Sequence, residues 1–238
     1  MSPDWVGGAI GGAAVTAVFK LAETIYERRA TRSLEASRTL SKYAKPLWFA
    51  CHNFEHRVKR LKKGLKNPNV LAPPQPRALE WYTKAGYFVT STAYLISAVA
   101  AWINLFERDV VFLEFREGAL TAEFFRQIEG LKNALSDKPS VLWYHYLDAI
   151  GEQLLVDEAR KPMTFAAFIQ MLHRDSAFRE FYDQLFQYLY QLKSDRFKEH
   201  LDHLLEATQS VKKFLEDHEA VPRLEQREGN DATMEASS

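Results

Sequence analysis

The stretch that decides the fold is AGYFVTSTAYLISAVAAWINLF, residues 85–106, in which no side chain is charged. A helix this long could cross a membrane, because a span needs roughly 20 apolar residues. Its hydroxyl and amide groups argue against a span, because each would need a hydrogen-bond partner in lipid. A helix that is apolar on most sides is typically buried in a protein core. We therefore predict that the central helix of a bundle runs from about residue 77 to residue 115, with a second membrane span over residues 85–106 as the alternative.

The segment before this helix carries one long apolar stripe. Steps of four and three residues predict a helix that begins near Pro46, and its inward positions are Leu47, Cys51, Phe54, Val58, Leu61 and Leu65. Four prolines in residues 67–76 predict a loop. Cys51 is the single cysteine, so the chain has neither an internal disulfide nor a cysteine-based zinc finger.

The segments after residue 115 predict further amphipathic helices. We expect one at 121–136 with Thr121 as N-cap, and one at 139–157 with Trp143, Leu147, Ile150 and Leu154 inward. Residues 164–193 should hold two helices broken near Asp175, and residues 195–217 the last helix. Apolar content falls from residue 219 onward, which predicts a disordered tail.

The N-terminal segment predicts a membrane anchor. Residues 5–19 carry no charge, and four glycines spaced for close helix packing lie within them: Gly7, Gly8, Gly11 and Gly12. Basic residues follow the run, which places the bulk of the chain in the cytoplasm. Only Asp4 precedes it, so a secretory signal peptide is disfavoured. A buried helix of a soluble protein is the alternative.

These patterns predict an all-α protein with four parts. Residues 1–26 form the anchor, 27–45 a helical neck, 46–218 a bundle of about six helices, and 219–238 the tail. The composition agrees, because 47% of residues are hydrophobic and only 10 are glycine and 9 proline. A disordered chain, a collagen-like repeat and an all-β sandwich are thereby disfavoured.

The central helix also carries a family resemblance. Tyr87, then Ser91-Thr92-Ala93-Tyr94-Leu95, Trp102 and Glu107-Arg108 resemble the same region of a group of uncharacterised bacterial proteins. The strings Ala149-Ile150-Gly151-Glu152 and Phe214-Leu215-Glu216-Asp217 are similar to that group as well. Ala93 departs from it, since a larger aliphatic residue is expected there. The resemblance spans residues 5–217 and implies a membrane-anchored helical domain, but no reaction.

Signatures of common enzyme chemistry are missing from the sequence. It has no phosphate-binding GxxxxGK[ST] loop, no HExxH zinc motif and no GxSxG elbow. No histidine has a glutamate three positions before it, which disfavours a di-iron carboxylate bundle. We predict no cofactor and identify no small-molecule substrate.

One polar helix face is the candidate for catalysis or metal binding. His145, Asp148 and Glu152 share a face, and burial near Trp143 would raise the pKa of Glu152. An ordinary solvated or salt-bridged face is the alternative. His200 and His203, in the last helix, are likewise expected on an exposed face.

A basic segment offers a docking surface. Residues 1–66 have a net charge of +8, against −1 for 67–118 and −7 for 119–238. The second half of the helix near Pro46 contains Arg57, Lys59, Arg60, Lys62, Lys63 and Lys66. Such a cluster suits an anionic membrane leaflet or a protein partner. No aromatic residue interrupts it, so nucleic-acid binding is unlikely. A merely solvated face is the alternative.

Together these features predict a non-enzymatic, membrane-tethered cytoplasmic interaction or scaffold module. Its expected partners are membrane lipids, a protein, and further copies of the chain through the glycine face. A metal- or carboxylate-dependent enzyme and a nucleic-acid-binding protein are the alternatives.

Overall fold

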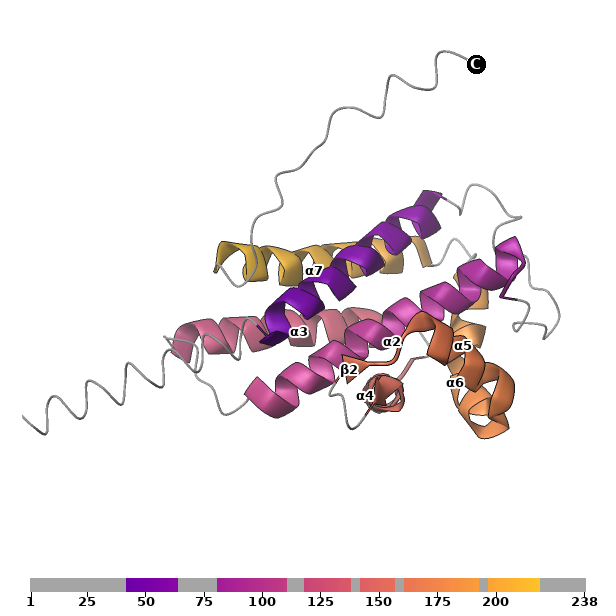
Figure 1. The fold of residues 1–238 in the computed structure, drawn as a ribbon. Helices are drawn as coiled ribbons and strands as arrows, with labels where there is room; N and C mark the ends of the chain where they lie inside the picture. Colours follow the sequence, from indigo (N-terminus) through magenta and orange to yellow (C-terminus); the bar gives the residue numbers. More distant parts are fainter. Residues whose placement is uncertain are drawn as a thin grey trace, which may run out of the picture.

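A computed structural model describes residues 42–63, 81–110, 118–137, 142–156, 161–192 and 197–218 of the chain. These residues form seven helices and, as their only strands, one short antiparallel pair (Figure 1). After the helix at residues 42–63 the elements are α2 (Lys84–Val110), α3 (Gly118–Ser136), α4 (Tyr144–Leu154), β1 (Leu155–Val156), β2 (Lys161–Pro162), α5 (Phe165–Arg174), α6 (Ser176–Gln191) and α7 (Lys198–Asp217). The predicted helical class is confirmed for this part of the chain.

Several predicted features lie outside the described residues. They are the anchor at 1–26 with Gly7, Gly8, Gly11 and Gly12, the neck up to residue 41, the loop at 67–76, Leu65, Lys66 and the tail at 219–238.

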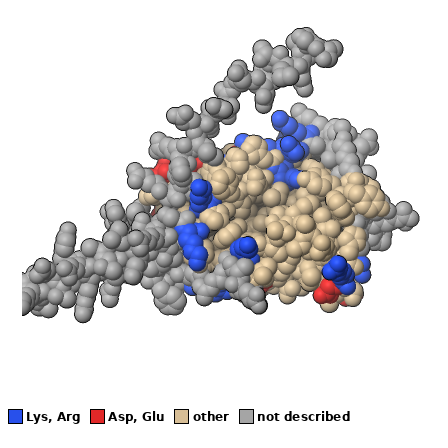
Figure 2. Space-filling view, in the orientation of Figure 1, with Lys and Arg blue, Asp and Glu red and all other residues tan. Residues whose placement is uncertain are grey.

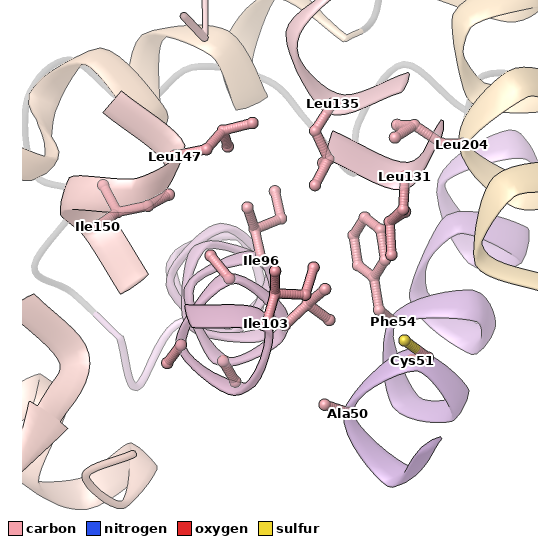
Figure 3. Close-up of a cluster of buried hydrophobic side chains, with 14 of the residues drawn as sticks. Ala50, Cys51, Phe54, Ile96, Ile103, Leu131, Leu135, Leu147, Ile150 and Leu204 are labelled. Carbon is pink, nitrogen blue, oxygen red and sulfur yellow. The ribbon is translucent and has the colours of Figure 1, made fainter. Parts of the chain in front are cut away.

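The central position of α2 determines the architecture. Ile96 and Ile103 are buried at the middle of the core, between α4 residues Leu147 and Ile150 on one side and α3 residues Leu131 and Leu135 on another (Figure 3). By length and composition alone α2 could span a bilayer over Gly86–Arg108, yet 72% of its most apolar window is buried inside the protein. This burial favours its interpretation as a core helix.

The polar groups of α2 are satisfied within the fold. Ser91, Thr92 and Ser97 donate to backbone carbonyls four residues earlier, at 2.5, 2.6 and 2.9 Å. The side-chain amide of Asn104 donates to the carbonyl of Asp148 in α4, at 2.8 Å. Side-chain bonds of this type allow hydroxyl residues to be buried in a helix without losing hydrogen bonds.

The contact between α2 and α4 depends on one glycine. A Cβ atom on Gly151 would lie 2.8 Å from the backbone carbon of Ala100 and 2.7 Å from the amide nitrogen of Asn104. Real side chains do not approach a backbone so closely, so only glycine permits this spacing. The glycine of the Ala149–Glu152 string thus has a packing role.

The helix at 42–63 and α7 close the bundle. Nε1 of Trp48, in the 42–63 helix, donates a 2.7 Å hydrogen bond to Oε1 of Glu216 in α7. Phe54 and Leu204 are both buried between them and α3 (Figure 3). The first and last described helices are therefore directly joined.

The break between α5 and α6 is confirmed at Asp175. Its carboxylate accepts a 3.0 Å hydrogen bond from the backbone N–H of Phe178, as an N-cap does. The preceding helix begins in the same way, with the Thr164 hydroxyl accepting from Ala167. The two-residue strands, which pair Leu155 with Pro162, were not predicted.

Four predicted helix starts are wrong. The central helix α2 begins at Lys84, after a turn at residues 81–83, and not near residue 77. The first helix is already formed at residue 42, because Tyr43 and Ala44 extend its buried stripe in front of Pro46. The helix predicted from residue 121 is α3, which begins at Gly118. Thr121 therefore lies in its first turn and is not an N-cap. The helix predicted from residue 139 begins only at Tyr144, because Trp143 precedes α4 in an extended conformation. Trp143 is also 75% exposed, so its predicted inward position is wrong.

Candidate functional site

The predicted basic docking face divides into residues with different roles. Lys59 forms an ion pair with Glu55 at 2.8 Å, and Lys62 forms one with Asp202 of α7. Arg57 is only 8% exposed. Arg60 and Lys63 are exposed, and Lys66 lies outside the described residues. Part of this charge is therefore used inside the protein.

Glu55 organises the inner side of the same helix. Its carboxylate accepts from Nζ of Lys212 at 2.6 Å and from the Gln209 amide at 2.9 Å. Burial alone would raise the pKa of Glu55, but hydrogen bonds from Gln209, Lys212 and Lys59 outweigh it and lower the pKa to about 2. The charged carboxylate thus fastens this helix to α7.

Arg57 is a buried cation of a different kind. Its Nη1 donates to the carbonyl of Phe88 at 3.0 Å and to the Thr92 hydroxyl at 3.1 Å. The guanidinium lies 4.5 Å from the centre of the Phe88 ring. Burial lowers the pKa of Arg57; Tyr87 opposes this shift and the nearby Arg60 adds to it. Among the described residues no carboxylate pairs with Arg57.

Arg57 lines a pocket of about 340 Å³ where three helices meet. The lining residues are Asn53, His56, Arg57 and Arg60 from the 42–63 helix, Tyr87, Ser91, Tyr94 and Leu95 from α2, and Phe165 from α5. None of them is acidic. Across the face drawn in Figure 2, Lys and Arg are likewise more frequent than Asp and Glu around an uncharged centre.

Three aromatic residues from α2 and α5 also line the pocket. Tyr87 is 50% exposed and meets the ring of Phe165 edge-on, with centroids 6.0 Å apart. Tyr94 meets the same ring at 5.4 Å, and its hydroxyl donates to the carbonyl of Met163 at 3.0 Å. Burial raises the pKa of Tyr94, so this phenol stays neutral at physiological pH. The pocket thus combines two cations with a fixed aromatic surface.

The polar face considered for catalysis or metal binding is solvated and salt-bridged in the structure. His145 and Glu152 are exposed, and Asp148 lies 2.7 Å from Nζ of Lys132 in α3. The expected burial of Glu152 against Trp143 is wrong, since both side chains face solvent. Within the described ranges no three His, Cys, Asp or Glu side chains converge as metal ligands would.

Lys132 occupies the centre of this region instead. It is buried, and its ammonium lies 3.3 Å from Glu107, and 4.3 Å from the centre of the Tyr144 ring. Burial would lower the pKa of Lys132, but the contacts with Asp148, Tyr144 and Glu107 raise it above its usual range. Asp148, a member of the candidate polar face, therefore neutralises the buried Lys132.

Of the two histidines expected on an exposed face, only His203 is exposed, and the expectation is wrong for His200. His203 is exposed, but His200 is 4% exposed, with Nε2 2.7 Å from the buried hydroxyl of Tyr188. Burial lowers the pKa of His200 to about 4, with His203 adding to this effect and Asp137 opposing it. The spacing from Phe197 to His200 to Leu204 places it on the apolar stripe, so a sequence signal for its burial did exist.

A similar signal existed for Arg57. It follows Phe54 by three residues and precedes Leu61 by four, so it borders the buried stripe of its helix. Its charge pointed to solvent, whereas its position pointed to the interior. The aromatic lining of the pocket had no such signal, because its residues come from distant segments.

Comparisons of the chain with family models, with curated proteins and with solved structures found no match in any of the three.

Proposed function

We propose that this chain is a non-enzymatic, membrane-tethered helical module that binds a small phosphate-type anion in the pocket beside Arg57. The observation that carries the proposal is the burial of this guanidinium without a carboxylate partner among the described residues. A buried charge costs several kcal/mol unless it is paired, roughly 2–7 kcal/mol even for an unpaired neutral polar group. An anionic ligand would supply the missing charge.

The geometry of Arg57 suits such a ligand. Both of its hydrogen bonds within the protein start at Nη1, so Nε and Nη2 retain their donors. Guanidinium groups bind phosphate and carboxylate oxygens through paired N–H donors. Arg60 and His56 contribute further donors at the pocket, and none of the described lining residues is an acid that would repel an anion.

The membrane tether in this proposal rests on the sequence. Residues 5–19 are uncharged, and Lys20, Arg28 and Arg29 follow them, as expected for an anchor whose bulk lies in the cytoplasm. Lipid docking through the 42–63 helix has less support, since Lys59 and Lys62 form ion pairs within the protein. Fractionation of the chain with and without residues 1–26, followed by carbonate extraction, tests the tether.

The enzyme alternative gains no support from the His145, Asp148 and Glu152 face, whose members point to solvent or pair with Lys132. Nucleic-acid binding through the basic helix gains no support either, because Lys59 and Lys62 form ion pairs with Glu55 and Asp202.

Calorimetric titration of the full chain in detergent micelles with inorganic phosphate tests the anion site. Arg57→Gln should weaken binding about ten- to a hundredfold, the value of a hydrogen bond to a charged group. Arg60→Gln should weaken it about fivefold, because this side chain is exposed. Lys63→Gln is the matched control, an exposed cation on the same helix outside the pocket. Equal effects of Arg60→Gln and Lys63→Gln, or no binding at all, would overturn the proposal.

A further inference from the structure

We infer that the ligand of this pocket is a free mononucleotide, with its phosphate on the arginine side and its base on the aromatic side. This inference rests on the proposed anion-binding function and adds the chemical class of the ligand. It follows from three features of the pocket: its division into two chemically different walls, the accessibility of one ring, and its size.

The two walls come from different elements. Arg57 and Arg60 are one turn apart on the 42–63 helix, whereas Tyr87 and Tyr94 project from α2 and meet Phe165 of α5. A simple inorganic anion would use the cationic wall alone. A ligand that uses both walls must join an anionic group to a flat apolar one.

Tyr87 is the ring available for stacking. Half of it is exposed, although it lies beside a buried core and carries a large apolar surface. The perpendicular contact with Phe165 supports the ring from one side. Nucleobases stack on aromatic side chains of this kind, and such contacts tolerate any base.

Asn53 adds a group that could read the base edge. It is exposed, lies one turn before Arg57 and lines the same pocket. A side-chain amide offers a donor and an acceptor together, which matches the paired groups on a base edge.

The volume selects among sources of this chemistry. A pocket of about 340 Å³ lies at the lower end of the range for small-molecule sites, roughly 300–1,000 Å³. One nucleoside monophosphate is of this size, whereas only the headgroup of a diacyl lipid or a single unit of an oligonucleotide would lie inside the pocket. We therefore assign the site to a free nucleotide.

The test compares ligands that differ by one part at a time. The full chain in detergent micelles is titrated with inorganic phosphate, ribose 5-phosphate, adenosine monophosphate and a short single-stranded oligonucleotide. Adenosine monophosphate should bind at least tenfold more tightly than ribose 5-phosphate, since stacking of one base contributes about that factor. Tyr87→Leu should remove this difference between the two ligands.

The matched control is Tyr82→Leu, because Tyr82 is an exposed aromatic residue five positions earlier that does not line the pocket. Phosphate binding without any gain from the base would overturn this inference and leave the anion site standing. Binding of none of the probes would overturn both. Tighter binding of the oligonucleotide, or displacement of the nucleotide by vesicles containing a phosphoinositide, would overturn the assignment to a free nucleotide.

Discussion

Trp48 and Glu216 are 168 positions apart in the chain, yet the indole of one donates a 2.7 Å hydrogen bond to the carboxylate of the other. The ammonium of Lys212 lies one turn away, 5.1 Å from the centre of the Trp48 ring and 2.6 Å from Glu55. The outer helices are thus held together by a small network of charged and aromatic groups, in addition to apolar packing.

The carboxylate of Glu55 should make stability depend on pH. Its pKa is lowered to about 2 in the fold from an ordinary value of 4.5, so it stabilises the protein above pH 4.5 and this contribution is lost as pH falls toward 2. Urea unfolding at pH 7 and pH 3 should show that Glu55→Gln loses roughly 2–3 kcal/mol at pH 7 and much less at pH 3. Glu129→Gln, an exposed acid in α3, should change neither value. An identical loss at both pH values would show that Glu55 is not the titrating group.

His200 should produce a second pH dependence at higher pH. Its pKa falls to about 4 from 6.5, so the unfolded chain binds a proton more readily between these values. Stability should therefore decline as pH is lowered from 6.5 to 4, by roughly 2–3 kcal/mol from this group. In His200→Gln that decline should largely vanish, as measured by urea titration at half-unit steps. His203→Gln, at an exposed position of the same helix, should retain it.

Replacement by alanine should have opposite effects on stability at Gly151 in α4 and at Gly130 in α3. Gly151→Ala would place a methyl group 2.8 Å from the backbone of Ala100, so it should destabilise the protein by about 1–3 kcal/mol. A Cβ atom on Gly130 would have no neighbour within 4 Å. Because this glycine lies inside a helix, Gly130→Ala should stabilise the protein by roughly 0.5–1 kcal/mol. Thermal melts of both variants measure the two shifts. A neutral Gly151→Ala would mean that α4 can move away from α2 at little cost.

Cys51 should be inert in the native protein. The side chain is fully buried, and burial raises the pKa of its thiol to about 12, so thiolate is scarce at neutral pH. A maleimide reagent should therefore label the native chain at least a hundredfold more slowly than the urea-unfolded chain. Mass spectrometry over time measures both rates. Rapid labelling at neutral pH would indicate that the 42–63 helix opens frequently by itself.

The sequence predicted helices best where apolar spacing was regular. Leu201, Leu204, Thr208, Val211 and Leu215 are all buried in α7, as their steps of three and four residues indicated. The break at Asp175 was predicted too, because its cap is a local interaction between neighbouring residues. Periodicity and capping are properties of a short segment, so one sequence is enough to reveal them.

The candidate site was not predictable in the same way. Arg57 and His200 carry polar groups that favour solvent, and their hydrogen-bond partners Phe88, Thr92 and Tyr188 come from other helices. The pocket brings together residues from 53 to 165, a proximity that depends on how the helices pack. The ion pair of Asp148 in the face at 145–152 was not predictable for the same reason, because Lys132 comes from another helix.

The join between Trp48 and Glu216 has a consequence for synthesis on the ribosome. The helix at 42–63 leaves the exit tunnel long before α7 exists, and at about 5–20 residues per second the delay for 168 residues is on the order of ten to thirty seconds. During that time Trp48 and Glu55 lack the α7 partners Glu216 and Lys212 that later bind them. The nascent chain therefore exposes this helix without its partner for much of translation. We expect chaperones that act on emerging polypeptides to bind it during that time.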